Sequence, residues 1–447
     1  MQFPDDFAWG TATSAYQIEG ACDADGKGPS VWDTFTQLKG KIKDRSSGQT
    51  ACNFYHHWSA DLDILAQLGI PNFRFSISWP RVIPQGTGAV NKAGLDFYDR
   101  LVDECLKRNI TPWLTLYHWD LPQALENRGG WTNRNVVDWY LAYADVVTKR
   151  LGDRVNHWMV LNEPLAYTGC GYFLGIHAPG KRWLKNFLPA VHHTSLVIGE
   201  GTRLIKANCP NAKVGSTFSG SWVEPHRPQN KADLAAAKRA DALLNRLFLE
   251  PALGLGYPLH DLPFIQKIEK WIQPGDEAKQ MAPLDFVGLQ LYTREVIRRH
   301  FLMPYIWARL VSARERKVPF TDMGWEIYPE ALKNQLLRFK ANYPQLPPIV
   351  VTENGAALPD PPPDANGKIV DTQRIAFLEG YIHQLKLAMD AGVDVRGYFV
   401  WSLLDNFEWA EGYRPRFGLV NVDYETQKRT IKDSGYWYGD FVNRNSQ

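Results

Sequence analysis

Short apolar segments rich in β-branched and aromatic residues recur along the chain. They lie at Asn72–Ser78, Thr111–His118, Trp158–Asn162, Lys213–Phe218, Phe286–Tyr292, Ile349–Thr352 and Val395–Leu403. Their hydrophobicity is nearly continuous, which is typical of strands in a parallel sheet that is covered on both faces. The pattern therefore predicts a buried parallel sheet.

Amphipathic helical segments lie between these strands. Apolar residues at helical spacing predict a helix that begins after Asp371 and ends before Gly392. Similar spacing predicts a helix that is capped by Thr132 or Asn133 and begins after that residue, and another over about Asn91–Lys107. Strands and helices thus alternate along the chain, which is the order expected for parallel βαβ units.

The number of these units indicates the fold. With Phe7–Thr13 counted as the first strand, the chain has eight strands, and it is predicted to form an α/β fold of one (β/α)8 TIM barrel. No linker divides the chain, because the proline-rich segment Pro359–Pro363 follows a strand and precedes a helix, as a loop does. The 447 residues therefore fit a single domain, residues 1–447, with long loops after the strands.

Composition and charge exclude several classes of protein. Hydrophobic residues make up 45% of the chain and charged residues 22%, as in folded soluble proteins. The 50 Lys and Arg nearly balance the 48 Asp and Glu, so no nucleic-acid partner is expected. No apolar run approaches the ~20 residues that span a membrane, and the N-terminus does not resemble a signal peptide. Five scattered cysteines without a C-x-x-C pair favour a reducing, cytoplasmic location.

Aromatic residues are abundant, with 17 Trp, 19 Tyr and 21 Phe. Tryptophan combines a large apolar face with a polar N–H group, so an excess of it suits a ligand with apolar faces and polar edges, such as a sugar. From composition alone, an aromatic core is the more frequent explanation.

Two glutamates follow predicted strands at the end where a barrel places its active site. Glu163 follows Trp158–Asn162, and Glu353 follows Ile349–Thr352. They are three βα units apart on a closed ring, so they can face each other across the barrel mouth. One such glutamate is more often a surface charge or a helix cap. Two that face one pocket supply what glycoside hydrolysis needs, an acid for the leaving oxygen and a nucleophile.

Four segments in order carry a resemblance to a known family. They are Phe7–Gly20, Leu161–Pro164, Ile349–Gly355 and Trp401–Trp409. With these motifs the chain resembles the family-1 glycoside hydrolases, the β-glucosidase and β-galactosidase group, over essentially its full length. In that family the segments are the N-terminal signature, the acid/base motif, the nucleophile signature and a sugar-binding loop.

The resemblance implies roles in catalysis. Glu353 would be the nucleophile and Glu163 the general acid/base. Arg74 would hold the pKa of Glu353 down, unless it forms an ion pair for packing alone, and Tyr292 would donate a hydrogen bond to Glu353. Asn162 would hydrogen-bond the sugar 2-hydroxyl. Burial and the second carboxylate should raise the pKa of Glu163.

The resemblance also implies a sugar-binding set, in which Asn162 and Tyr292 take part. The further positions are Gln17, His118, Trp119, Glu408 and Trp409 for the hydroxyls, Trp401 as the stacking platform and Trp325 on the leaving-group side. His118 also fits a core histidine that is satisfied inside the protein. It does not predict a metal site, since no other His or Cys lies at ligand spacing.

Two positions depart from the family pattern. Gln290-Leu291-Tyr292 stands where the family usually has Asn-Tyr-Tyr, so the contacts around the nucleophile are expected to differ. Leu165 stands where many members have Trp after Asn-Glu-Pro, which affects the leaving-group side.

The sequence thus predicts a retaining, exo-acting β-glycosidase, in the first place a β-glucosidase acting on terminal non-reducing β-D-glucosyl residues, with some tolerance of β-galactosyl and β-fucosyl groups. Expected substrates are small β-glucosides or cello-oligosaccharides, as in cellulose degradation, without a metal or cofactor, and a homo-oligomer is left open. One alternative is a 6-phospho-β-glucosidase, which the carboxylate of Glu408 disfavours. The other is a catalytically silent carbohydrate-binding homologue, which the presence of both glutamates disfavours.

Overall fold

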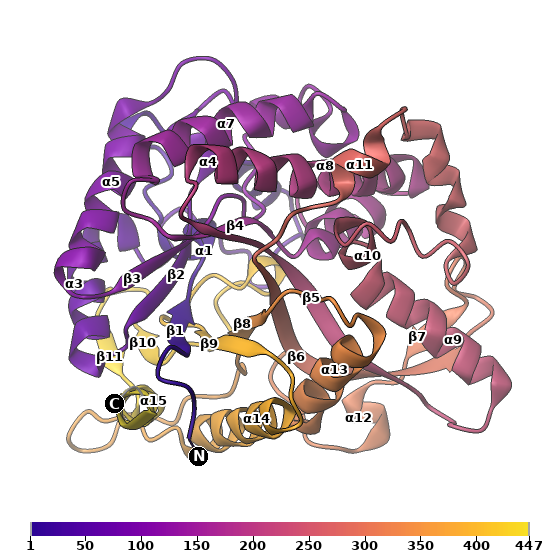
Figure 1. Cartoon of the computed structure of the whole chain (residues 1–447). Helices are drawn as coiled ribbons and strands as arrows, with labels where there is room; N and C mark the ends of the chain where they lie inside the picture. Colours follow the sequence, from indigo (N-terminus) through magenta and orange to yellow (C-terminus); the bar gives the residue numbers. More distant parts are fainter. Residues whose placement is uncertain (1, 446–447) are drawn as a thin grey trace.

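Parallel strands close into a barrel at the centre of the molecule (Figure 1). The computed structural model describes residues 2–445. Going around the ring the order is β5-β4-β3-β2-β1-β9-β8-β6, and pairing of β6 with β5 closes it. The strands are β1 Ala8–Ala12, β2 Asn72–Ser76, β3 Thr111–Thr115, β4 His157–Asn162, β5 Lys213–Pro225, β6 Phe286–Arg299, β8 Ile349–Asn354 and β9 Val395–Trp401. The predicted (β/α)8 barrel is confirmed, with all eight strands in place.

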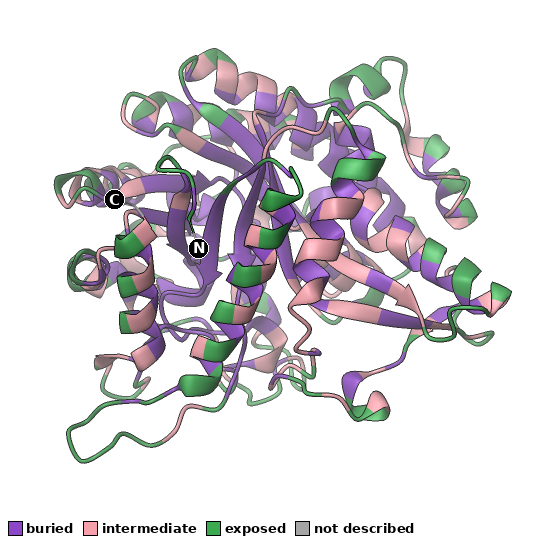
Figure 2. Ribbon diagram, turned by 60° about the horizontal axis from the view of Figure 1, so that its bottom comes forward, coloured by how far each residue is buried: buried purple, intermediate pink, exposed green. Residues whose placement is uncertain are grey.

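Helices surround the barrel, and their outer sides are the exposed ones (Figure 2). The long helices are α3 Phe54–Leu68, α5 Lys92–Lys107, α7 Val136–Leu151, α8 Leu184–Asn208, α9 Lys231–Asp241, α13 Glu330–Asn342, α14 Thr372–Asp390 and α15 Asp433–Asn445. The short ones are α1 Ala15–Ile18, α2 Val31–Phe35, α4 Trp79–Val82, α6 Gln123–Glu126, α10 Leu249–Ala252, α11 Asp276–Gln280 and α12 Ala313–Arg316. Within residues 2–445 no helix is long and apolar enough to cross a membrane.

The predicted helices are all present, with one shifted start. Helix α5 matches its expected range, and α14 begins after Asp371 as expected. The side chain of Asp371 accepts hydrogen bonds from Arg374 and Ser434 instead of capping α14. Helix α7 begins at Val136, later than predicted, because Gly130–Thr132 forms a separate 3-10 turn.

Strands β5 and β6 extend well beyond their predicted ends. They stay paired as far as Pro225 and Ile297, and β7 (Ala308–Leu310) adds to β6 in the antiparallel direction. The sequence analysis ended these strands early because polar residues interrupt the apolar runs there, as they do in strands that rise above a barrel and are partly exposed. A second, two-stranded sheet joins β10 (Val420–Val422) and β11 (Arg429–Ile431).

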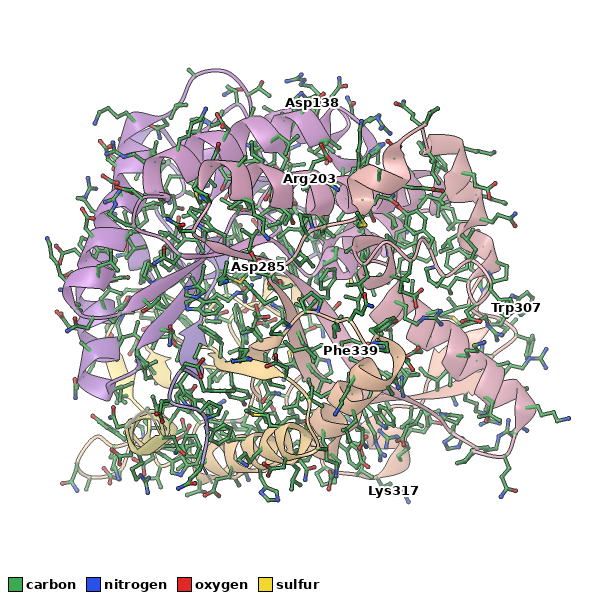
Figure 3. All side chains as sticks on the ribbon, in the orientation of Figure 1. Asp138, Arg203, Asp285, Trp307, Lys317 and Phe339 are labelled. Atoms are coloured by element: carbon green, nitrogen blue, oxygen red, sulfur yellow. The ribbon has the colours of Figure 1, made fainter. Side chains whose placement is uncertain are left out.

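The barrel closes between β5 and β6 at their amino ends with help from Asp285, which Figure 3 labels near the start of β6. Its carboxylate accepts a hydrogen bond from the backbone N–H of Val214 at 2.9 Å and pairs with Lys206 at 2.8 Å. Its own N–H donates to the Val214 carbonyl. These contacts fix the register of the two strands that carry several residues of the site.

Much of the tryptophan excess lies in the core. The side chains of Trp9, Trp32, Trp79, Trp131 and Trp158 are all fully buried. The barrel interior is itself aromatic, with Trp113, Phe286 and Phe399 packed against Met159 and Val350. The composition therefore reflects both an aromatic core and, as described next, an aromatic cavity.

Candidate active site

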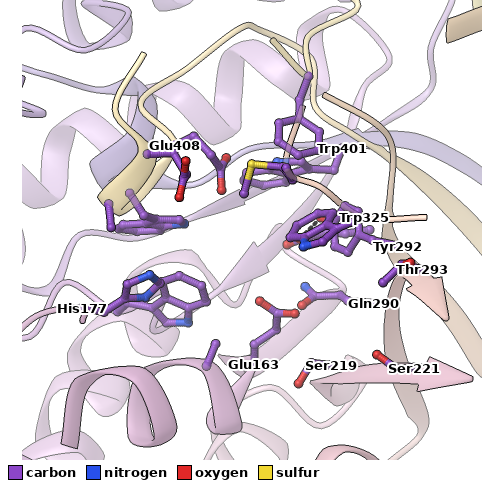
Figure 4. Close-up of a pocket in the computed structure, with 18 of the residues that line it drawn as sticks. Glu163, His177, Ser219, Ser221, Gln290, Tyr292, Thr293, Trp325, Trp401 and Glu408 are labelled. Atoms are coloured by element: carbon purple, nitrogen blue, oxygen red, sulfur yellow. Dashed lines mark hydrogen bonds between the residues drawn. The ribbon is translucent and has the colours of Figure 1, made fainter. Parts of the chain in front are cut away.

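A cavity of about 320 Å³ opens at the carboxyl ends of the barrel strands (Figure 4). Barrels of this class place their active sites at this end, and the volume suits a small ligand. Most of the predicted site residues line it, namely Gln17, His118, Trp119, Glu163, Tyr292, Trp325, Glu353, Trp401, Glu408 and Trp409. The fold thus brings together residues from both ends of the chain.

Irregular pairing precedes both glutamates. The register of β4 with β5 shifts before Asn162, and that of β8 with both neighbours shifts just before or at Glu353. Such bulges re-aim side chains at the rims of barrels. Glu163 has a left-handed backbone with φ of 40°, and its N–H donates to the Thr217 carbonyl at 3.0 Å. Residues other than glycine adopt this conformation at a cost that is often tied to function.

Two donors hold the Glu353 carboxylate from inside the barrel. Arg74 Nη1 donates to one oxygen at 2.5 Å, and the Tyr292 hydroxyl donates to the other at 2.6 Å. Burial raises the pKa of Glu353, and Arg74 and Tyr292 oppose that rise. The cation expected from the sequence is present, but the net direction is upward because removal from water outweighs the arginine.

Glu163 lies in a different environment. Burial raises its pKa well above the ordinary value, the nearby carboxylates of Glu353 and Glu408 raise it further, and only Arg74 opposes. Glu353 therefore ionises first and Glu163 keeps its proton to higher pH. Two carboxyl groups whose surroundings separate their pKa values are the arrangement of an acid paired with a nucleophile.

Asn162 lies behind the cavity wall and is fully buried. Its Oδ1 accepts hydrogen bonds from Arg74 Nη2 and Gln290 Nε2, each at 2.5 Å, and from Thr217 Oγ1 at 3.0 Å. Its Nδ2 lies 3.1 Å from His118 Nε2. The glutamine that departs from the family pattern is thus bonded directly to the residue expected to contact the sugar.

His118 is a neutral donor that faces the cavity. Burial and the nearby Arg74 hold the pKa of His118 well below its usual 6.5. Because Nε2 accepts from Asn162, the proton is assigned to Nδ1, which has no partner among the described residues. This free donor distinguishes His118 from a core histidine that is satisfied inside the protein. Among residues 2–445 no group of His, Cys, Asp and Glu side chains could hold a metal ion.

The inner end of the cavity is walled by buried side chains. Gln17 is 0% exposed, Trp409 5% and Glu408 9%. Gln17 Nε2 donates to Asn406 Oδ1 and to the Phe407 carbonyl, both at 2.9 Å, and so ties the start of the chain to the loop after β9. Burial and the charge of Glu353 raise the pKa of Glu408 to about 8.

The sequence analysis missed part of the lining. His177, Met323, Phe417 and Glu411 line the cavity, as do Ser219, Ser221, Thr293 and Glu295 on the extended ends of β5 and β6. Had β5 and β6 been predicted at their full length, the four residues on their extended ends could have been assigned to the site. Leu165, the other position that departs from the family pattern, does not line this cavity; it lines a small separate cavity together with Phe218 and Leu243.

Comparisons with known proteins agree with this geometry. "Beta-glucosidase A" of Thermotoga maritima is 42% identical over 445 residues, covering 99% of this chain and 98% of that protein. "1,4-beta-D-glucan glucohydrolase" of Thermotoga neapolitana is 43% identical over 446 residues, 99% of each chain. The structure of the Thermotoga maritima β-glucosidase in complex with glucoimidazole superposes with a TM-score of 0.95 at 41% identity, covering 100% of this chain and 99% of the other. The family described as "Glycosyl hydrolase family 1" matches residues 1–447, and the chain belongs to this family.

Proposed function

We propose that this β-glucosidase releases terminal non-reducing β-D-glucosyl residues by double displacement, with the whole chain acting as one catalytic domain. Glu353 attacks the anomeric carbon and forms a covalent glucosyl-enzyme, while Glu163 serves as general acid and then as general base. Relatives named as β-glucosidases over the full chain length support a glucosidase over the alternatives.

The observation that carries the residue roles is the contrast between the two carboxyl groups. Glu353 receives hydrogen bonds from Arg74 and Tyr292, which stabilise its ionised form and hold it in place. Glu163 faces the same cavity, where burial and then the charges of two other carboxylates favour its protonated form. An ionised nucleophile and a protonated acid are the states in which a retaining reaction begins.

The same electrostatics let Glu163 change roles. In the first step it gives its proton to the leaving oxygen as Glu353 bonds to the sugar. Burial still raises the pKa of Glu163, but Glu353 is then a neutral ester and its charge no longer adds to that rise, so Glu163 becomes a stronger acid than before. As a carboxylate it can take the proton of the water that hydrolyses the ester.

We expect the first-formed glucose to be the β-anomer, because two inversions at the anomeric carbon retain its configuration. The carboxyl groups of Glu163 and Glu353 should then lie ~5–5.5 Å apart in a crystal structure. Proton NMR during the first minutes of hydrolysis of an aryl β-glucoside checks the stereochemistry. Initial α-glucose would rule out the covalent role of Glu353.

Substrates are proposed to be small β-glucosides and cello-oligosaccharides, with some β-galactosyl and β-fucosyl tolerance. A relative named "1,4-beta-D-glucan glucohydrolase" supports the cello-oligosaccharides. The cytoplasmic location, the absence of a nucleic-acid partner and a homo-oligomeric assembly stay predictions from the sequence.

Glu408 is proposed to exclude 6-phosphorylated sugars. The described lining of the cavity contains Glu408 but no lysine or arginine that could bind a phosphate dianion. With a pKa of about 8, Glu408 is mostly ionised at pH 9 and repels such a group there. We expect Glu408→Ser to lower kcat/KM for nitrophenyl β-glucoside at pH 9, while the 6-phosphoglucoside to glucoside ratio rises by about 10-fold. An equal loss of kcat/KM on both substrates would show that Glu408 has a structural role only.

A further inference from the structure

A largely buried cluster of charges surrounds the loop that joins Trp401 to Glu408, the two side chains that Figure 4 labels at the upper side of the cavity. Its cations are Lys432, Arg374 and Arg416, and its anions are Asp360, Asp371 and Asp405. Positive and negative charges are thus equal in number. None of these six residues lines the cavity, and the catalytic roles proposed above use none of them.

Lys432 joins two loops of the barrel through one ammonium group. It follows β11 and precedes α15, and its side chain is 0% exposed. Its Nζ donates to Asp405 Oδ1 at 3.0 Å and lies 2.8 and 2.7 Å from the two carboxylate oxygens of Asp360. Asp360 belongs to the loop after β8, the strand of Glu353, and Asp405 belongs to the loop after β9, the strand of Trp401.

The backbone of Lys432 is itself held on two sides. Its N–H donates to the Leu419 carbonyl at 2.9 Å, and the N–H of Asp433 donates to the Ile369 carbonyl at 2.9 Å. Ile369 and Lys432 also form a parallel bridge. The buried ammonium group therefore extends from a fixed point in the fold.

Asp405 receives donors at both of its carboxylate oxygens and is 0% exposed. Besides the bond from Lys432, Oδ1 accepts from the Gly418 N–H at 2.8 Å, and Oδ2 accepts from Arg416 Nη1 at 3.3 Å. A Cβ at Gly418 would lie 2.1 Å from the Asp405 nitrogen, so this close approach requires glycine. These contacts hold the loop after β9 against the segment that leads into β10.

The side chain of Glu408 depends on this loop because it has little support of its own. Among the described residues its carboxylate accepts one hydrogen bond, from Gln17 Nε2 at 3.4 Å. The same Nε2 donates to Asn406 Oδ1 and to the Phe407 carbonyl, both at 2.9 Å. Since Asn406 directly follows Asp405, a displacement of Asp405 would move the partners that align Gln17 with Glu408.

We propose that Lys432 is a positioning residue for glucose recognition, which acts through Asp405 to hold the loop that presents Glu408 to the 6-hydroxyl of the sugar. The inference rests on the proposed function, in which Glu408 lies beside the 6-position. Without the ammonium group, the buried carboxylates of Asp360 and Asp405 would have less positive charge between them, and their repulsion would displace the two loops.

The test compares p-nitrophenyl β-glucoside with its 6-deoxy analogue, which lacks only the oxygen that Glu408 would contact. Lys432→Met removes the charge but keeps a long side chain. It is expected to lower kcat/KM by about 10-fold for the glucoside, the loss of one good hydrogen bond, and by less than about 3-fold for the 6-deoxyglucoside. Asp405→Asn keeps the shape of its side chain and should shift the ratio in the same direction. It decides the question if Lys432→Met does not fold.

Arg134→Met is the matched control for the loss of a buried ion pair. Arg134 pairs with the buried Asp276 at 2.5 Å and so joins the start of α7 to α11, and neither residue lines the cavity. This variant also leaves a buried carboxylate without its cation, so its melting temperature should fall. The ratio between the two glucosides should stay as in the wild-type protein, because the loop after β9 keeps its contacts.

An unchanged ratio in Asp405→Asn or in folded Lys432→Met would overturn the positioning role, since a cluster that serves stability alone favours neither sugar. The same change in ratio with Arg134→Met would overturn it as well. A wild-type protein that cleaves both glucosides equally well would remove the contact with the 6-hydroxyl and with it the role of Lys432, while the release of glucosyl residues would stand. Failure of the wild-type protein to cleave any β-glucoside would instead contradict the proposed function.

Discussion

Glu353→Gly is expected to lower hydrolysis of every β-glucoside by at least about 10⁴-fold, because no covalent intermediate can form. Added azide or formate should restore turnover, since a small anion can occupy the space of the missing carboxylate. The azide product should be α-glucosyl azide, because a single displacement inverts the anomeric carbon. Kinetics with a dinitrophenyl glucoside and NMR of the product measure both effects.

Glu353→Gln is the matched control for this rescue. It removes the nucleophile but fills the same space beside Arg74 and Tyr292, so azide should restore little activity. Retained activity of Glu353→Gly without any added anion would exclude Glu353 as the nucleophile. Rescue that yields the β-azide would place the nucleophile elsewhere.

The expected effect of Glu163→Ala depends on the leaving group. For cellobiose, whose leaving alcohol needs a proton, kcat/KM should fall by about 10³-fold or more, whereas a dinitrophenyl glucoside should lose far less in its first step. The fall in activity as pH rises should also disappear, since wild-type Glu163 acts as an acid only below its raised pKa. Rates measured over a series of leaving groups test the first expectation, and rates measured over a range of pH test the second.

Azide provides a second measure for Glu163→Ala. Here it attacks the glucosyl-enzyme in place of base-activated water and should give β-glucosyl azide, the opposite anomer to that from Glu353→Gly. Glu163→Gln keeps the size of the side chain and serves as the control for packing. Equal loss on cellobiose and on the dinitrophenyl substrate would remove Glu163 from the acid role.

The sequence was sufficient to predict the barrel because each strand is marked by a local pattern of residues. Continuous apolar runs mark each strand, and Glu163 and Glu353 stand directly after or at the end of such runs. The (β/α)8 topology then determines which strand ends meet. Residues as distant as Gln17 and Glu408 were assigned to one site through the resemblance to the family, and their side chains lie 3.4 Å apart in the structure.

What the sequence could not supply depends on contacts across the fold. The net rise in the pKa of Glu353 is a balance of burial against Arg74, and burial is a property of the whole structure. The outer ends of β5 and β6 were missed because their polar residues resemble a loop until the two strands are seen to pair. Gln290 was recognised as a departure, but its bond to Asn162 was not foreseeable.

The walled inner end of the cavity determines the order in which products leave. Under the proposed function, glucose held against Gln17, Glu408 and Trp409 would have to leave through the open mouth of the cavity, so the leaving group would depart first. Free glucose should therefore inhibit competitively as it accumulates. During the lifetime of the proposed glucosyl ester, the mouth of the cavity would be open to alcohols, so a dissolved sugar could compete with water for the glucosyl group. We expect the balance between hydrolysis and transfer to shift with the concentration of such acceptors.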